Sequence, residues 1–417
     1  MESSSALDLA KHTLLLFGII LAVGTFSGLL ARLVRVPDVV VFLLIGMLLG
    51  PAVMGLLNVR ADSAINQLIL IFGSSYILFD GGASVRLKVL KEVWITVVVL
   101  STVGVLITAA ITGAAAHYIL GVPFIVALLL GTVIASTDPA TLVPVFKQIR
   151  IKDRVAQTVM SESAFNDAMG AILTFTVLAV AMGAGAFSAG DAMADLLKQS
   201  VLGIVIGGAL GYLAAFLIAH EKFSFLAEYA PVVTLMAVIG AYMGADGLHS
   251  SGFMAVFVFG IMLGNQESLG FRVAKRDQLQ LKDFILTTAL IMRMFIFILL
   301  GSQVDFGLMN QYLLGGVTVV AVFMLVARPV TVFLCALPDR RAQWSLREML
   351  FMCWTRETGV IPGALAGLLL GMKAPGAQMI ASITFIAILM TILIQATTTR
   401  WLAAKLGLLI DDKTANI

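Results

Sequence analysis

The sequence predicts an all-α polytopic membrane protein with about thirteen transmembrane helices. Sixty per cent of its 417 residues are apolar and only 12 per cent are charged, whereas a soluble domain carries about 25 per cent charged residues. Apolar stretches of about 20 residues, the length that crosses a bilayer, follow one another from near residue 13 to near residue 404. We therefore expect residues 1–417 to form a single integral membrane unit with a short cytoplasmic tail at 405–417.

The helices are predicted from these apolar stretches, with ends defined to within a few residues. In chain order, the thirteen predicted helices are residues 13–31, 37–57, 64–82, 91–117, 122–147, 154–182, 193–219, 228–246, 251–265, 281–301, 311–336, 345–371 and 377–404.

The loop charges predict the orientation of the chain in the membrane. Lys and Arg gather in the connections after odd-numbered helices, for example Arg86, Lys152, Lys222, Arg276 and Arg340, and are scarce after even-numbered ones. Because Lys and Arg mark the cytoplasmic side, we expect the N-terminus outside and the C-terminus in the cytoplasm. The net charge of +3 belongs to these loops, so it gives no reason to expect a nucleic-acid partner.

An internal repeat links the two halves of the chain. FLLIGMLLGP at 42–51 and VFVFGIMLGN at 256–265 align with an offset of 214 residues, from Gly46 to Gly260 and from Gly50 to Gly264. The copies lie in helices 2 and 9, and a separation of an odd number of helices gives them opposite orientations. We therefore expect two inverted repeats, at about 13–219 with a linker helix and at about 228–404, a plan typical of secondary transporters.

Two of the helices carry signals for an interruption. Helix 5 contains Ser136-Thr137-Asp138-Pro139-Ala140, and proline removes a backbone donor and disfavours helical geometry in the preceding residue. Its repeat counterpart, helix 12, contains Arg356 and Glu357 shortly before Gly359 and Pro362. Two broken helices that cross at mid-membrane would offer free carbonyls and helix ends to an ion.

Helix 6 carries the densest group of polar residues. Glu162, Ser163, Asn166 and Asp167 recur at three-, four- and five-residue spacings, which place them on one helix face. Two carboxylates so close repel each other. We therefore expect Glu162 to form a structural ion pair with Arg328 of helix 11, which leaves Asp167 as the titrating group; the alternative is that Arg328 extends to the cytoplasmic face.

Other ionisable residues in the spans have less defined roles. Asp80, at the end of helix 3, either serves a site or marks the membrane boundary, and Arg293 in helix 10 is a buried cation whose partner the sequence does not identify. The roles of Arg356 and Glu357 also stay open. Cys335 and Cys353 lack a metal-binding spacing and are interpreted as reduced residues of the helix packing.

Four of these segments together resemble the NhaP-type sodium/proton antiporters of bacteria, in the monovalent cation:proton antiporter-1 family. They are LFDGG at 78–82, STDPA at 136–140, SESAFND at 161–167 and ARP at 327–329. The resemblance covers nearly the whole chain and implies a homodimer in the inner (plasma) membrane, with a dimerisation domain and a six-helix core. Two positions depart from the family pattern: Asp80, where relatives commonly have Glu, and Glu357, where many have Gly after the arginine.

The resemblance also implies roles for single residues. Asp167, Ser163, the backbone of Thr137 and the acid at Asp80 would bind the cation or the proton, and Asn166 and Asp138 would support the site. Proton and cation would compete for Asp167, because desolvation favours its neutral form and the charged, empty carboxylate crosses the membrane poorly. Asn166 before Asp167 indicates one cation per proton and electroneutral exchange, with no cofactor.

The alternatives are a potassium/proton antiporter of the same fold, a cation channel, a sodium-coupled solute symporter, and an intramembrane aspartyl protease that uses Asp138 and Asp167 as a catalytic dyad. Sodium is the cation that we expect first, with lithium and potassium as alternatives.

Overall fold

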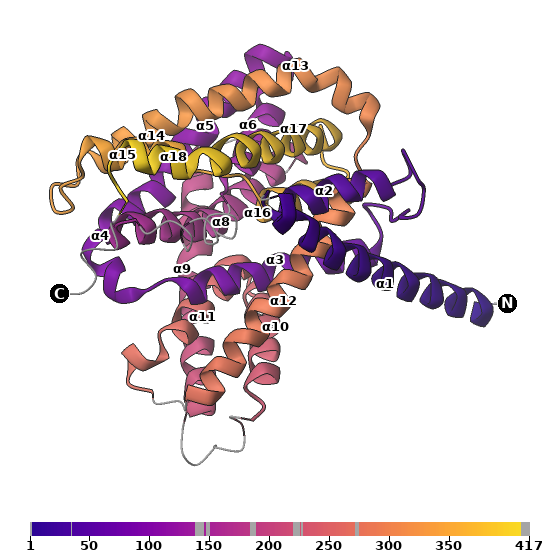
Figure 1. The fold of residues 1–417 in the computed structure, drawn as a ribbon, viewed down its shortest axis with the longest axis horizontal. Helices are drawn as coiled ribbons and strands as arrows, with labels where there is room; N and C mark the ends of the chain where they lie inside the picture. Colours follow the sequence, from indigo (N-terminus) through magenta and orange to yellow (C-terminus); the bar gives the residue numbers. More distant parts are fainter. Residues whose placement is uncertain are drawn as a thin grey trace.

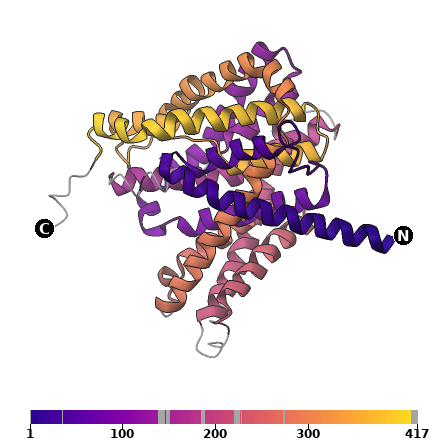
Figure 2. The same cartoon turned by 45° about the vertical axis from the view of Figure 1, so that its right-hand side comes forward.

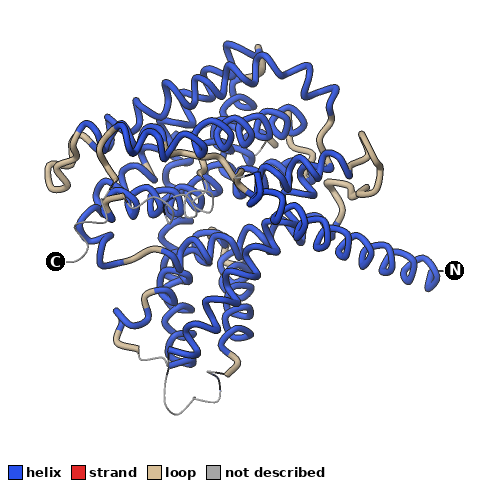
Figure 3. Tube along the Cα trace, viewed as in Figure 1, coloured by secondary structure: helices blue, strands red, loops and turns tan. Residues whose placement is uncertain are grey.

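The computed structural model describes residues 2–34, 36–137, 146, 151–183, 189–219, 226, 228–271 and 275–409. This part of the chain consists of helices joined by loops (Figure 3), and its one β pairing is an isolated bridge between Ile151 and Leu409. Helices α10, α11 and α12 lie together on one side of the molecule and α13, α14, α17 and α18 on the other (Figures 1 and 2).

The first half of the chain supplies the helices α1 (Glu2–Val34), α2 (Asp38–Leu49), α3 (Ala64–Ser84), α4 (Leu87–Ser101), α5 (Val103–Leu120), α6 (Phe124–Ala135), α8 (Asp153–Ala181) and α9 (Ala189–Ala219).

The second half supplies α10 (Ala230–Gly247), α11 (Gly252–Gly264), α12 (Lys275–Ser302), α13 (Phe306–Val322), α14 (Arg328–Ala336), α15 (Leu346–Trp354), α16 (Val360–Gly371), α17 (Ala377–Met390) and α18 (Thr397–Lys405). A short 3₁₀ turn, η2, covers Gln266–Leu269. Two π-helical segments, η3 (Phe323–Ala327) and η4 (Thr391–Ala396), connect α13 to α14 and α17 to α18.

The pattern of long and short helices agrees with the predicted thirteen spans. Nine helices in the described residues are long and apolar enough to cross a membrane, and four further apolar helices are shorter: α2, α6, α11 and α16. The short ones are the second, fifth, ninth and twelfth predicted spans. They therefore occupy corresponding places in the two halves of the chain, seven spans apart.

Several predicted boundaries were wrong. The second helix ends at Leu49, well before residue 57, because Gly50 is extended and Pro51 follows, and proline cannot continue the backbone hydrogen bonds. The first helix begins at Glu2 rather than near residue 13, so polar residues extend it beyond the apolar stretch. Figure 1 shows this N-terminal part of α1 projecting from the rest of the molecule.

Glycines give the two halves reciprocal close contacts. A methyl group at Gly46 of α2 would lie 2.3 Å from the carbonyl oxygen of Ile298 in α12, and one at Gly260 of α11 would lie 2.2 Å from that of Phe79 in α3. The second helix thus packs on the tenth as the ninth packs on the third. Helix backbones approach this closely only where small residues separate them.

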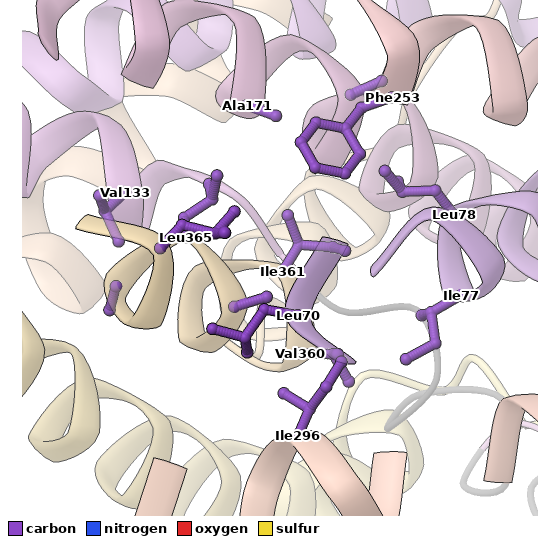
Figure 4. Packing of buried hydrophobic residues seen from close by; sticks show 14 of the residues in the cluster. Leu70, Ile77, Leu78, Val133, Ala171, Phe253, Ile296, Val360, Ile361 and Leu365 are labelled. Carbon is purple, nitrogen blue, oxygen red and sulfur yellow. The ribbon is translucent and has the colours of Figure 1, made fainter. Parts of the chain in front are cut away.

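The buried core spans both halves. Leu78 of α3, Val133 of α6, Phe253 of α11, Ile296 of α12 and Leu365 of α16 belong to one cluster of buried side chains (Figure 4). Because α16 contacts α3, α6, α8 and α12, the helix that follows the second interruption lies at the centre of this packing and fixes the position of that interruption.

Candidate functional site

The polar face of α8 is buried inside the protein. Glu162 and Asp167 are each 2% exposed, Ser163 is 3% exposed and Asn166 is fully buried. Burying such groups is costly unless charges are paired and polar atoms are hydrogen-bonded. The predicted common face is therefore present, and the contacts of its members decide what each one does.

Glu162 and Arg328 form a bidentate ion pair. Nη1 of the arginine lies 2.5 Å from Oε1 of Glu162 and Nη2 lies 2.8 Å from Oε2, and both side chains are almost fully buried. The Arg328 Nε also donates to the carbonyl oxygen of Met352, near the end of α15. This arrangement excludes the alternative in which Arg328 extends to the cytoplasmic face. The positive charge of Arg328 neutralises the carboxylate of Glu162.

Asn166 connects this pair to the rest of the face. Its Nδ2 donates to Oε1 of Glu162 at 3.1 Å, while its Oδ1 is buried without a hydrogen-bond partner. The Asn166 amide thus holds the carboxylate of Glu162, which lies one helical turn earlier on α8. Asp167, the next residue along α8, keeps a carboxylate that does not take part in the Glu162–Arg328 pair.

The interruption of the fifth span lies directly against α8. Helix α6 ends at Ala135, and Ser136 and Thr137 are not helical. Thr137 Oγ1 lies 2.8 Å from Ser163 Oγ, and a methyl group at Gly170 of α8 would lie 2.6 Å from Ser136 Oγ. The hydroxyls of Thr137 and Ser163 therefore meet one helical turn from Asp167. Asp138 lies outside the described residues.

The interruption of the twelfth span falls between α15 and α16, at residues 355–359. It comes earlier than Pro362, which lies in the first turn of α16, where proline is tolerated. Arg356, 2% exposed, donates through Nη2 to the carbonyl oxygen of Ala135 and through Nη1 to Thr108 Oγ1 at 3.3 Å. Its guanidinium lies 5.5 Å from the centre of the Phe323 ring.

This role of Arg356 was not predicted from the sequence. The C-terminal end of a helix carries a partial negative charge and free carbonyls, and Ala135 is the last residue of α6. A signal was present, because Arg356 stands in the repeat counterpart of helix 5, but the sequence did not show which carbonyl it would reach.

The remaining predicted residues lie in different surroundings. Asp80 is half-buried near the end of α3, and α3 contacts α8. Glu357 is fully buried in the interruption of the twelfth span. Arg293 is half-buried within α12.

The two interrupted helices and the polar face of α8 therefore form one buried cluster. It offers the carboxylate of Asp167, the hydroxyls of Ser163 and Thr137 and the end of a broken helix, all of them oxygen donors suited to a hard cation, in a polytopic helical fold. These features define a secondary transporter of a small ion.

The comparisons with known proteins identify the family. The family model described as sodium/hydrogen exchanger, transmembrane, matches residues 18–405. The chain therefore belongs to the sodium/hydrogen exchanger family and is a multi-pass membrane protein.

Individual relatives agree with this assignment. The chain is 33% identical over 84% of its length to Na(+)/H(+) antiporter 1 of Methanocaldococcus jannaschii, covering 81% of that protein. It is 29% identical over 94% of its length to the K(+)/H(+) antiporter NhaP of Alkalimonas amylolytica, covering 67% of that protein. The structure of the sodium proton antiporter MjNhaP1 from M. jannaschii at pH 8 is similar with a TM-score of 0.82 at 30% identity, over 97% of this chain and 99% of that one.

Proposed function

We propose that this chain exchanges one monovalent cation, sodium in the first place, for one proton by competition at Asp167. This proposal is based on the different surroundings of the two carboxylates on the polar face of α8, Glu162 and Asp167. Glu162 is neutralised by Arg328 at 2.5 and 2.8 Å, whereas Asp167 lies beside the hydroxyls of Ser163 and Thr137, which are 2.8 Å apart.

The chemistry of exchange follows from the burial of Asp167. A carboxylate with almost no contact with water is costly when it is charged and empty, so it is occupied either by a proton or by a cation. Ser163 and Thr137 supply neutral oxygens that replace part of the water around the cation. Asp80 and Asp138 complete the proposed set of ligands and supporting groups, with Asn166 holding Glu162 in place.

Similarity to named relatives makes sodium and potassium the two candidate substrates. The relative from M. jannaschii is named as a sodium/proton antiporter and the one from A. amylolytica as a potassium/proton antiporter. Among the buried residues of α8, Asp167 is the one carboxylate outside the Glu162–Arg328 pair, and the residue before it, Asn166, is uncharged. This supports electroneutral exchange, and the family of the chain supports a transporter rather than an enzyme.

The proposed assembly is a homodimer in the plasma membrane. Its N-terminus would lie outside and its C-terminus in the cytoplasm, as the distribution of Lys and Arg predicts. Residues 13–219 and 228–404 would form the inverted repeats, and the reciprocal glycine contacts at Gly46 and Gly260 support this division.

The test is proton movement in proteoliposomes that contain a lumenal pH dye, with sodium, potassium and lithium added in turn at several pH values. Asp167→Asn should abolish exchange, because the amide keeps the shape but cannot change its charge. The matched control is Asp153→Asn, which removes an exposed carboxylate in the first turn of the same helix. Normal exchange by Asp167→Asn would refute the site.

The same assay separates the alternatives. A channel would pass cations without moving protons, a symporter would require an organic solute, and a protease would cleave a peptide without a cation gradient. Coupled counter-movement of cation and proton in the wild-type protein is expected only from an antiporter.

A further inference from the structure

The thirteenth span, formed by α17, η4 and α18, holds the second interruption through two side-chain hydrogen bonds. Thr391, the first residue of η4, accepts a hydrogen bond at Oγ1 from the backbone nitrogen of Thr358, at 3.0 Å. Trp354, the last residue of α15, donates through Nε1 to Thr398 Oγ1 in α18, at 2.8 Å. Because residues 355–359 separate α15 from α16, the two bonds fix the chain just before the interruption and near its end.

The hydroxyl of Thr391 acts as an acceptor toward the interruption. Its own hydrogen is used within the span, where Oγ1 donates to the carbonyl oxygen of Ala387 at 2.7 Å, a bond to the residue four positions earlier that Thr often makes in helices. Thr391 and Thr358 are both fully buried. A buried backbone N–H that loses its partner costs free energy comparable to a lost hydrogen bond, so the backbone at Thr358 depends on this oxygen.

The first half of the chain has a similar arrangement. There the first interruption meets the following span, α8, where Thr137 Oγ1 lies 2.8 Å from Ser163 Oγ. In the second half, the following span supplies Thr391 to Thr358. In each half, a hydroxyl on the next span therefore contacts the interrupted one. The partners differ, because the first contact holds a hydroxyl of the proposed cation site and the second holds a backbone N–H.

The second interruption reaches the proposed cation site through Arg356. This residue lies two positions before Thr358 and donates through Nη2 to the carbonyl oxygen of Ala135, the last residue of α6. Thr137 follows two residues later and carries one of the two hydroxyls of the site. A fixed backbone at Thr358 thus fixes the direction from which Arg356 reaches α6. Thr391 is linked to the site by this chain of contacts, without belonging to the site itself.

We propose that Thr391 is a positioning residue for cation binding, which sets the place of the second interruption and, through Arg356, that of the Thr137 hydroxyl. The inference rests on the proposed exchange at Asp167. Without the Thr391 oxygen the backbone at Thr358 can shift, so cation binding must first restore the geometry of the ligands. The apparent affinity for the cation then falls, while the carboxylate that takes the proton is retained.

The test measures proton flux in proteoliposomes as a function of sodium concentration, at an alkaline pH where protons compete least. Thr391→Val removes the oxygen with little change in shape. It should raise the apparent KM for sodium by about tenfold, the effect of losing one buried hydrogen bond. The maximal rate should change by less than about twofold, as when an interaction that supports binding is lost. Thr391→Ser keeps the oxygen and should retain the wild-type KM.

The matched control is Thr384→Val, in α17 of the same span. Thr384 is also fully buried, but its hydroxyl has no hydrogen-bond partner among the residues that the structure describes. The substitution is therefore the same chemical change in the same span without the loss of a contact. It should leave the apparent KM for sodium unchanged.

A purely structural role of Thr391 would lower the amount of active protein, and so the maximal rate, without raising the KM. A wild-type KM in Thr391→Val, or an equal rise in Thr384→Val, would therefore overturn the positioning role. If Thr391→Val does not fold, Thr391→Cys takes its place, because sulfur is only a weak acceptor. The cysteine variant should also raise the KM, and a wild-type KM there would overturn the inference as well.

These outcomes are distinct from a failure of the proposed function. A wild-type KM in the Thr391 variants would leave exchange at Asp167 intact and remove only the positioning role. Absence of sodium-dependent proton flux in the wild-type protein would refute the proposed function, and this inference with it.

Discussion

Arg356 of the second interrupted span donates a hydrogen bond to the carbonyl oxygen of Ala135, the last residue of α6 in the first. One broken helix thus stabilises the end of the other. The guanidinium is held by Thr108 Oγ1 at 3.3 Å and by the ring of Phe323. Since Ser136 and Thr137 follow Ala135 directly, Arg356 sets the position of the proposed cation site without lying on α8.

Arg356→Gln should reduce exchange by more than about tenfold and lower the thermal midpoint. The substitution removes the positive charge of Arg356 from the carbonyl end of α6, and such a charge stabilises a partly buried helix end by up to about 2 kcal/mol. Arg356→Lys should recover part of the loss. The measurement is cation-dependent proton flux together with thermal unfolding of the purified protein.

The matched control for Arg356 is Arg347→Gln, which removes an exposed arginine from α15 and should leave both quantities unchanged. Equal effects of the two substitutions would contradict the helix-end role of Arg356.

Glu162→Ala should destabilise the protein by about 3–5 kcal/mol, because it leaves the buried guanidinium of Arg328 without its partner. Replacing both residues with methionine should recover much of this stability, since an apolar pair of similar volume carries no unpaired charge. Thermal midpoints of the two variants in the same detergent test this comparison. A Glu162→Ala protein as stable as the wild type would show that the pair is not needed for folding.

Gly46→Ala and Gly260→Ala should each destabilise the protein by about 1–3 kcal/mol, the usual cost of overpacking. The added methyl group would meet a backbone carbonyl at 2.3 and 2.2 Å respectively, and backbone cannot move aside easily. Gly208→Ala in α9 is the control, because nothing lies within 4 Å of a methyl group there. Thermal midpoints that fall for Gly208→Ala as much as for the other two would contradict the reciprocal packing.

Much of the fold could be predicted because lipid imposes simple rules. A span must be apolar and about 20 residues long, so composition alone located the thirteen spans. The contact of Glu162 with Arg328 could also be predicted, since oppositely charged side chains inside membrane spans are expected to pair. The common face of Ser163 and Asp167 followed from helical spacing.

What the sequence did not predict depends on distances between helices. The contact between Arg356 and Ala135 requires the relative depth of two spans, which no local pattern contains. The early end of α2 was missed because the residues after Pro51 are still apolar, and hydrophobicity alone does not show where a helix ends. The surroundings of Arg293 depend on which faces of α3 and α16 meet α12, and this is set by the glycines that contact them.

The most direct test of the account is the affinity of the purified protein for sodium, measured by calorimetry from alkaline to acidic pH, with Asp167→Asn as the reference. Competition for one carboxylate predicts that the apparent Kd rises by about tenfold per pH unit once the site begins to protonate, and that Asp167→Asn shows no such dependence. A sodium affinity that stays constant as the pH falls would contradict the shared site.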